Sequence, residues 1–223
     1  MPVEKSTGIF LVDRFVTRFY AGSIKTNGDT MKPFKAIGSM LACALFFSHA
    51  AIAVELAGVK LDDSIKLAGQ NLRLNGAGIR TKVIFKVYAI GLYLTDKKTT
   101  TAEVMAAPGA RRVTLAMLRD VGSEEFAKAF SHGIEQNTDA AERAALAAPM
   151  VKFNAMFASV AELKQGDVLN LDWLSGSGMV VLLNGKKILE PIADQAFYNA
   201  VLRIWLGAKP VDDKLKRQLL AEQ

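Results

Sequence analysis

The stretch NLRLNGAGIRTKVIFKVYAIGLYL, from Asn71 to Leu94, is the most informative part of this chain. Two apolar segments, Leu72–Asn75 and Lys82–Leu94, have the composition of β-strands and flank the turn NGAG. Arg80 follows that turn, among mostly apolar residues. An unpaired buried charge is costly, so its guanidinium must point to water, pair with a surface carboxylate, or meet an anionic or electron-rich ligand. Arg80 is therefore the first candidate for a functional residue.

The two glycines of the turn, Gly76 and Gly78, suggest a phosphate-binding loop at first glance. A dinucleotide-binding fingerprint requires a third glycine and a helix that starts directly after the loop. Here Arg80 and Thr81 lead into a strand instead. We therefore interpret the glycines as a tight hairpin turn that needs positive φ angles.

The N-terminal region differs from the rest of the chain. Residues Met31–Ala53 contain two lysines, an apolar run and a closing small-x-small site, which together predict a secretory signal peptide. Cleavage would leave a periplasmic or secreted protein that begins at Val54, which N-terminal sequencing of exported material would test. A membrane anchor over Ala36–Val54 is the alternative, but two serines and a histidine interrupt its apolar tract. Residues 1–30 precede a plausible start at Met31 and are assigned no function.

Charge and cysteine content limit the function classes. Without residues 1–53, the chain keeps 22 Lys and Arg against 19 Asp and Glu, a net charge of +3. No cluster of basic residues stands out, so no nucleic-acid partner is expected. The only cysteine, Cys43, leaves with the signal, and His132 then remains as the only histidine. Disulfides, thiol catalysis and metal sites made of thiolates or several histidines are excluded, and no cofactor is expected.

The remaining residues, 54–223, have the pattern of a single α+β domain. An Asn-Gly pair at Asn184-Gly185, between two apolar runs, is a strong hairpin signal. We expect strands at Val54–Leu61 and Arg112–Leu118, and three more after Gly166, over DVLNLDWL, MVVLL and KKILE. We expect helices at Thr100–Ala107, after the N-cap Ser123, at Asp139–Val160, at Asp194–Leu206 and at Lys214–Ala221. The helix at Asp139–Val160 should break or kink at Pro149.

Other chemically suggestive residues have simpler explanations. His132 projects away from the face that carries Phe126 and Phe130, so a solvated histidine is expected and Ser-His-Asp catalysis is not. The adjacent acids Asp62-Asp63 and Asp212-Asp213 are interpreted as caps or solvated charges. Helically spaced methionines and phenylalanines are expected to form core rather than a cofactor site; they are Met150, Phe153, Met156 and Phe157.

The segments NGAGIR and FKVYAIGLYL together resemble the chalcone isomerase family, whose members have a glycine-rich turn ending in arginine and then a strand of the K-x-T-A-I-G-x-Y-L type. The resemblance continues through RVTLAML and the following helix to FYNAVLRIWLG, roughly residues 56–220. It implies a large antiparallel sheet and a layer of helices around a mostly apolar cleft.

The resemblance also assigns site residues. Arg80 matches the arginine that, in the plant enzymes, polarises an enone during ring closure. Tyr88 stands where the enzymes have threonine, Phe126 where they have tyrosine, and Gly133 where they have asparagine. Arg80 is thus kept, whereas the polar tyrosine and asparagine of the enzymes are replaced by Phe126 and Gly133. This combination is similar to the fatty-acid-binding branch of the family, where an arginine and a tyrosine hold a carboxylate.

Three functions follow from these observations. The first is an exported bacterial chalcone isomerase-like protein that binds a small apolar or amphipathic acid, such as a fatty acid, through Arg80, Tyr88, Phe126, Phe130 and Gly133. The second is an isomerase or intramolecular lyase that acts on an enone, with Arg80 as electrophilic catalyst. The third is a periplasmic scaffold whose cleft is filled by its own side chains. No stable membrane insertion is expected after signal cleavage, and the oligomeric state is left open.

Overall fold

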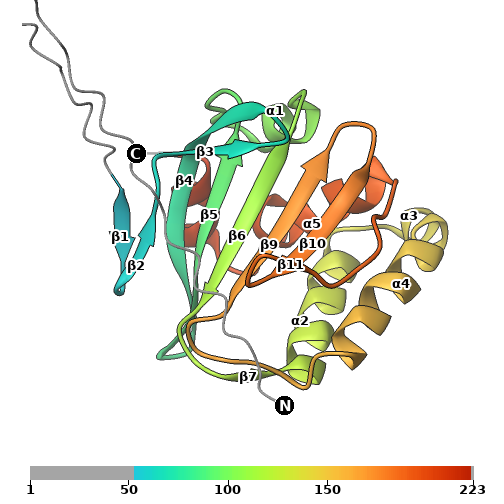
Figure 1. The fold of residues 1–223 in the computed structure, drawn as a ribbon. Coiled ribbons are helices and arrows are strands. Elements are labelled where there is room, and N and C mark those ends of the chain that lie inside the picture. Colours follow the sequence, from blue (N-terminus) through green and yellow to red (C-terminus); the bar gives the residue numbers. More distant parts are fainter. Residues whose placement is uncertain (1–52, 222–223) are drawn as a thin grey trace, which may run out of the picture. The chain divides into compact units, whose positions relative to one another are not determined.

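The computed structural model describes residues 53–221, which form an antiparallel sheet with helices on one side (Figure 1). The main sheet has seven strands in the order β11-β10-β9-β6-β5-β4-β3, and each neighbouring pair is antiparallel. The predicted α+β class is therefore confirmed. The strands of this sheet are β3 (Ser64–Leu67), β4 (Gln70–Lys82), β5 (Phe85–Leu94), β6 (Arg111–Met117), β9 (Val168–Leu174), β10 (Gly178–Leu183) and β11 (Lys186–Lys187).

The predicted signal peptide, the alternative anchor and the upstream residues 1–30 lie almost entirely outside the described residues, and they stay predictions. Within residues 53–221, no helix combines the length and the apolar character needed to cross a bilayer.

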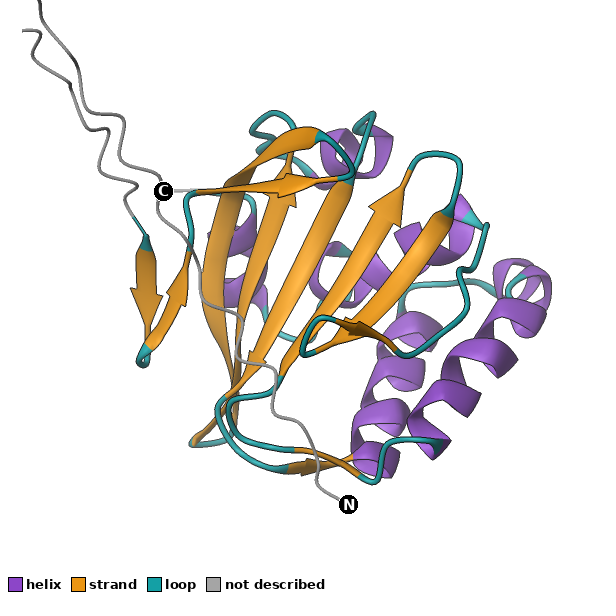
Figure 2. Cartoon of the chain, viewed as in Figure 1, coloured by secondary structure: helices purple, strands orange, loops and turns teal. Residues whose placement is uncertain are grey.

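The helices and the short strands complete the domain, and Figure 2 shows the helices gathered behind the sheet. Two small antiparallel pairs, β1–β2 and β7–β8, lie outside the main sheet. These elements are β1 (Val54–Leu56), β2 (Val59–Leu61), α1 (Thr101–Ala106), β7 (Val121–Gly122), α2 (Ser123–Gln136), α3 (Ala140–Ala145), α4 (Ala147–Ala158), β8 (Glu162–Leu163), α5 (Gln195–Leu206) and α6 (Asp213–Leu219).

The interpretation of NGAG as a hairpin turn is wrong. Gly76 and Gly78 lie inside β4, and neither has a positive φ angle. A Cβ atom at Gly76 would lie 2.1 Å from the carbonyl oxygen of Gln218, in the last turn of α6, and one at Gly78 would lie 2.3 Å from Oε1 of the same residue. These glycines therefore let α6 pack closely on the strand, and the chain turns later, at Val83 and Ile84.

The main core lies between the sheet and the helices. Alternate residues of β5 point into it because strand side chains alternate between the two faces of a sheet, and Ile90, Leu92 and Leu94 are at most 1% exposed. Phe130 of α2 packs edge-on against Trp205 of α5, with ring centroids 5.5 Å apart. The expected core role of the α4 side chains is confirmed, since Phe153, Met156 and Phe157 are buried in the core cluster and Met150, which is partly buried, packs against that cluster.

The opposite face of the sheet carries a second, smaller cluster of buried residues. Tyr93, which alternates with the core residues of β5, packs there with side chains from β2, from β4 and from the segment before β6; these are Leu61, Leu72, Leu74 and Ala110. The β1–β2 hairpin contributes Leu56 and Val59 to this cluster. Both faces of the central strands are therefore covered.

Several element boundaries differ from the prediction. Val54–Leu61 is a hairpin rather than one strand, and its turn residues Ala57 and Gly58 both have positive φ angles. Gly122, not Ser123, is the N-cap of α2. The second predicted helix breaks at Leu146 and not at Pro149, which lies in the first turn of α4, where a missing N–H costs little.

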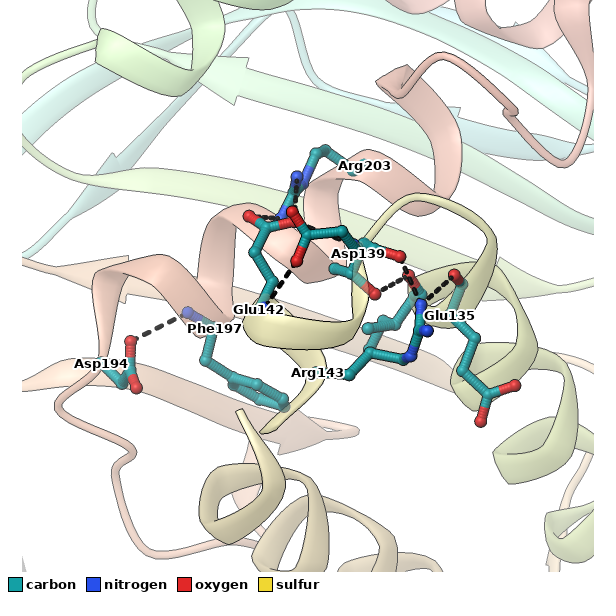
Figure 3. A network of polar contacts seen from close by, with 9 residues as sticks. Glu135, Asp139, Glu142, Arg143, Asp194, Phe197 and Arg203 are labelled. Carbon is teal, nitrogen blue, oxygen red and sulfur yellow. Dashed lines mark hydrogen bonds and ion pairs between the residues drawn. The ribbon is translucent and has the colours of Figure 1, made fainter. Parts of the chain in front are cut away.

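Polar contacts attach α3 to its neighbours (Figure 3). Asp139 and Glu142 form a reciprocal capping box at the start of α3. Glu142 also accepts hydrogen bonds from Arg203 of α5, at 3.0 and 3.3 Å. Arg143 donates to backbone oxygens of Glu135 and Thr138, so the short helix is fixed to both α5 and the end of α2.

Candidate functional site

A pocket of about 630 Å³ lies between the end of the β4–β5 hairpin, the first turns of α2, and α5 with the loop that follows it. Its walls are apolar, and its rim carries exposed charged or polar side chains. The wall residues are Val87, Val121, Phe126, Phe130, Ile204 and Val211, and the rim residues are Lys82, Glu124, Glu125, Lys128 and His132. Arg80 and Tyr88 are the remaining polar residues that line the pocket.

The strand register places Arg80 and Tyr88 together. Arg80 of β4 is the direct partner of Tyr88 of β5, and a register shift follows immediately at Thr81. Cross-strand partners project from the same face, so both side chains reach the pocket. The register of an antiparallel hairpin thus brings the two predicted polar residues side by side.

The guanidinium of Arg80 is only partly engaged. Its Nη1 atom donates to the carbonyl oxygen of Thr81 and lies 3.6 Å from Oδ2 of Asp212, and the Arg80 side chain is 22% exposed. Within residues 53–221, Nε and Nη2 of Arg80 have no hydrogen-bond acceptor. Arginine has five N–H donors, so most of those of Arg80 are not engaged by the described residues.

Asp212 was missed as a site residue. It had been interpreted as a cap, and it is one: its Oδ1 atom accepts the backbone N–H of Leu215 at 3.0 Å and caps α6. Its other oxygen faces Arg80. The packing of α6 on β4 brings this acid to Arg80, and at 3.6 Å with both side chains partly exposed it pairs with the guanidinium only in part.

Tyr88 is held as a protonated phenol. Its side chain is 7% exposed, and its oxygen accepts a hydrogen bond from Nε1 of Trp205 at 2.9 Å. Burial raises the pKa of Tyr88 to about 12, although the Trp205 hydrogen bond and the Arg80 charge act in the other direction. Because the oxygen accepts from Trp205, the phenolic proton is available to an acceptor in the pocket.

A comparison with protein families identifies this architecture. A family model described as chalcone isomerase-like matches residues 53–221. The chain belongs to the chalcone isomerase-like family. The resemblance seen in the sequence is therefore confirmed.

Comparison with solved structures agrees on the fold of this chalcone isomerase-like domain. A fatty-acid binding protein from Arabidopsis thaliana superposes with a TM-score of 0.62 over 76% of this chain and 96% of its own, at 16% sequence identity. At that identity the likeness concerns the fold. Among curated proteins, no sequence matches the chain.

The remaining predicted site residues of the chalcone isomerase-like domain divide into two groups. Phe126 and Phe130 form part of the pocket wall. Gly133 does not line the pocket: a Cβ atom there would lie 2.9 Å from Cγ2 of Ile204, so the glycine permits the close crossing of α2 and α5. His132 is exposed, as predicted, and lies on the pocket rim. The part of the chain that the structure describes contains no group of three or more His, Cys, Asp or Glu placed to hold a metal ion.

Proposed function

We propose that this chalcone isomerase-like domain binds a small apolar carboxylic acid, such as a medium-chain fatty acid, with its carboxylate at Arg80 and Tyr88. The observation that carries the proposal is an apolar pocket of about 630 Å³ with a partly engaged guanidinium among its lining groups. That volume lies within the range of small-molecule sites. An acyl chain suits the wall made by Phe126, Phe130 and Val121, and a carboxylate suits the planar fork of arginine.

Asp212 competes weakly for Arg80. The two side chains are each 22% exposed and 3.6 Å apart, and solvated pairs of this kind contribute at most about 1 kcal/mol. A ligand carboxylate that accepts two N–H bonds from Nε and Nη2, plus the Tyr88 proton, gains charged hydrogen bonds of roughly 1.5–3 kcal/mol each. A ligand can therefore bind Arg80 while Asp212 remains on Nη1.

The other two functions fit the site less well. For an isomerase, the Tyr88 hydroxyl is the one uncharged polar group of the described pocket lining that lies beside Arg80, and Phe126 and Phe130 add none. The neighbouring Asp212 carboxylate also weakens the field that would polarise an enone. For a scaffold with a filled cleft, the pocket should be occupied by the protein's own side chains, which the open volume contradicts. Stereoselective chalcone cyclisation that Arg80→Ala abolishes would favour the isomerase.

Calorimetric titration with decanoate tests the proposal. Arg80→Ala should weaken binding about tenfold or more, and Arg80→Lys should restore part of the loss because an ammonium lacks the planar fork. Tyr88→Phe should have a smaller effect, since it removes one neutral donor. Arg73→Ala is the matched control, because Arg73 is an exposed arginine on the same strand that does not line the pocket.

Decanol in place of decanoate separates the two parts of the site. Decanol should bind the wild-type protein more weakly than decanoate does. Its affinity for Arg80→Ala should be about the same as its affinity for the wild-type protein. Decanoate binding that is unchanged in Arg80→Ala would refute the carboxylate anchor.

A further inference from the structure

The turn between β4 and β5 exposes three consecutive large apolar side chains. Val83, Ile84 and Phe85 are 89%, 78% and 57% exposed, whereas the other exposed large apolar side chains within residues 53–221, Val54 and Val151, stand singly. The turn lies at the end of the sheet where α2 begins (Figure 1). An exposed apolar cluster of this kind indicates a contact surface rather than a solvated loop.

The turn projects beyond the rest of the sheet. Strand β6 pairs with β5 only from Tyr88 onward, so Thr81–Lys86 pairs only within its own hairpin. Val83 has a φ angle of 59°, a region that a β-branched residue rarely adopts. Glycine or asparagine would adopt this turn without strain, yet the position holds a large apolar side chain. Strain of this kind typically marks a functional segment.

Basic side chains surround the apolar tip. Lys82 and Lys86 flank it in the chain, and the guanidinium carbon of Arg119 lies 5.6 Å from the centre of the Phe85 ring. Glu125 lies 3.3 Å from Lys82 and offsets part of this charge, which leaves an excess of cations around Val83–Phe85. Apolar residues that protrude between cations match the layered chemistry of an anionic bilayer surface.

We propose that Val83, Ile84 and Phe85 insert into the interface of an anionic phospholipid bilayer, with Lys82, Lys86 and Arg119 on the lipid headgroups. A bilayer fits better than a protein partner because three protruding side chains cannot supply the roughly 1,000 Å² of complementary surface that a specific protein interface needs. Membrane insertion requires no shape complementarity. Because Lys82 also lines the pocket, docking brings the pocket rim to the lipid surface. This attachment is peripheral and does not depend on the proposed ligand.

Co-sedimentation with vesicles tests this surface, without any added fatty acid. Wild-type protein should bind vesicles of phosphatidylcholine with phosphatidylglycerol, and Val83→Ser/Ile84→Ser/Phe85→Ser should bind about tenfold more weakly or worse. Val151→Ser is the matched control: Val151 is 70% exposed on α4, away from the hairpin, and the variant should bind like wild type. Lys86→Gln and higher salt should weaken binding to anionic vesicles but not to phosphatidylcholine alone.

A second measurement reports insertion itself. Tryptophan fluorescence of Ile84→Trp should shift to the blue on vesicles and be quenched by lipids brominated on their acyl chains. Equal vesicle binding by the triple serine variant and wild type would overturn the proposal, as would an Ile84→Trp signal unaffected by brominated lipid. Self-association of wild type that the triple variant lacks, without vesicle binding, would assign the tip to a protein contact and also overturn it.

Discussion

Two arginines of this domain show how a structural guanidinium differs from one available to a ligand. Arg111 is fully buried, and its Nη1 atom donates to the carbonyl oxygens of Val104 and Met105 and to Asn199. Its buried Nε and Nη2 atoms have no hydrogen-bond partner among the described residues, and its guanidinium carbon lies 5.0 Å from the ring centre of Tyr198. It fixes the end of α1 to α5. Arg80 instead has one backbone acceptor, one distant acid and access to a pocket. Arg80 is thus only partly paired within the described residues, and several of its N–H groups have no acceptor there.

Val83 allows a test of backbone strain at the hairpin tip. A non-glycine residue at a φ angle of 59° costs roughly 1–3 kcal/mol, whereas glycine costs about 0.5–1 kcal/mol more chain entropy on folding. Val83→Gly should therefore raise the free energy of unfolding, by about 1 kcal/mol for the middle of these two ranges. Urea denaturation measures this change.

Ile84→Gly is the control for Val83→Gly. Ile84 is also exposed but has no positive φ angle, so glycine there relieves no strain and should destabilise the domain. If both substitutions lower stability equally, Val83 is not strained. A gain in stability of Val83→Gly together with weaker vesicle binding would show that the valine is kept for the surface and not for folding.

At the scale of elements, the Asn-Gly turn was predictable from local chemistry, whereas the turns at Ala57-Gly58 and Val83-Ile84 and the distant packing were not. Asn184-Gly185 connects β10 to β11 with φ angles of 51° and 78°, the two positive values that such a two-residue turn requires. The glycines of NGAG look equally turn-like in the sequence. Their role depends on α6, which follows more than a hundred residues later, so no local pattern could distinguish a turn from a strand that accepts a helix.

The close approach of α6 to β4 predicts an order of effects for alanine substitutions. Gly76→Ala should destabilise the domain most, by about 2–3 kcal/mol, because its Cβ would meet backbone oxygens of Gln218 and Leu219 that cannot rotate away. Gly78→Ala should cost less, since the end of the Gln218 side chain and a Leu215 methyl group can move. Gly122→Ala is the control for the added Cβ, which would have no atom within 4 Å, and it should cost only the smaller loss of a glycine N-cap.

Urea denaturation gives the order of the three variants, and decanoate titration gives a second readout. A shifted α6 would move its N-cap Asp212 away from Arg80, so Gly76→Ala should change ligand affinity as well as stability. Equal stability losses at Gly76 and Gly122 would show that α6 does not rest on this strand.

For the whole molecule, the order of strands and helices could be predicted from periodicity, and the family resemblance supplied their arrangement. It also directed attention to Arg80 and Tyr88, which the strand register does bring together. Asp212 and the packing role of Gly133 escaped prediction because each depends on where a distant helix lies. Sequence patterns report which face of an element is apolar, but not which helix crosses it.

The buried tyrosines make the stability of the whole domain sensitive to alkaline pH. Burial raises the pKa of Tyr88 and of Tyr93 to about 12, and it raises the pKa of Tyr198 further. In the unfolded chain these phenols ionise near their ordinary pKa of 10.0. Between about pH 10 and 12 the unfolded state therefore releases protons that the folded state retains. The stabilisation is fully present below pH 10 and is lost as the pH rises through the folded-state values.

Each such tyrosine lowers the free energy of unfolding by about 1.4 kcal/mol per pH unit in this window, so three lower it by about 4 kcal/mol per unit. Urea midpoints measured by circular dichroism should stay nearly constant from about pH 8 to 9.5 and fall steeply above 10. Tyr93→Phe removes one titrating group outside the pocket and should reduce the slope by about a third. Midpoints that stay flat to pH 11, or a slope that Tyr93→Phe leaves unchanged, would show that the phenols ionise equally in both states and are not shielded by the two cores.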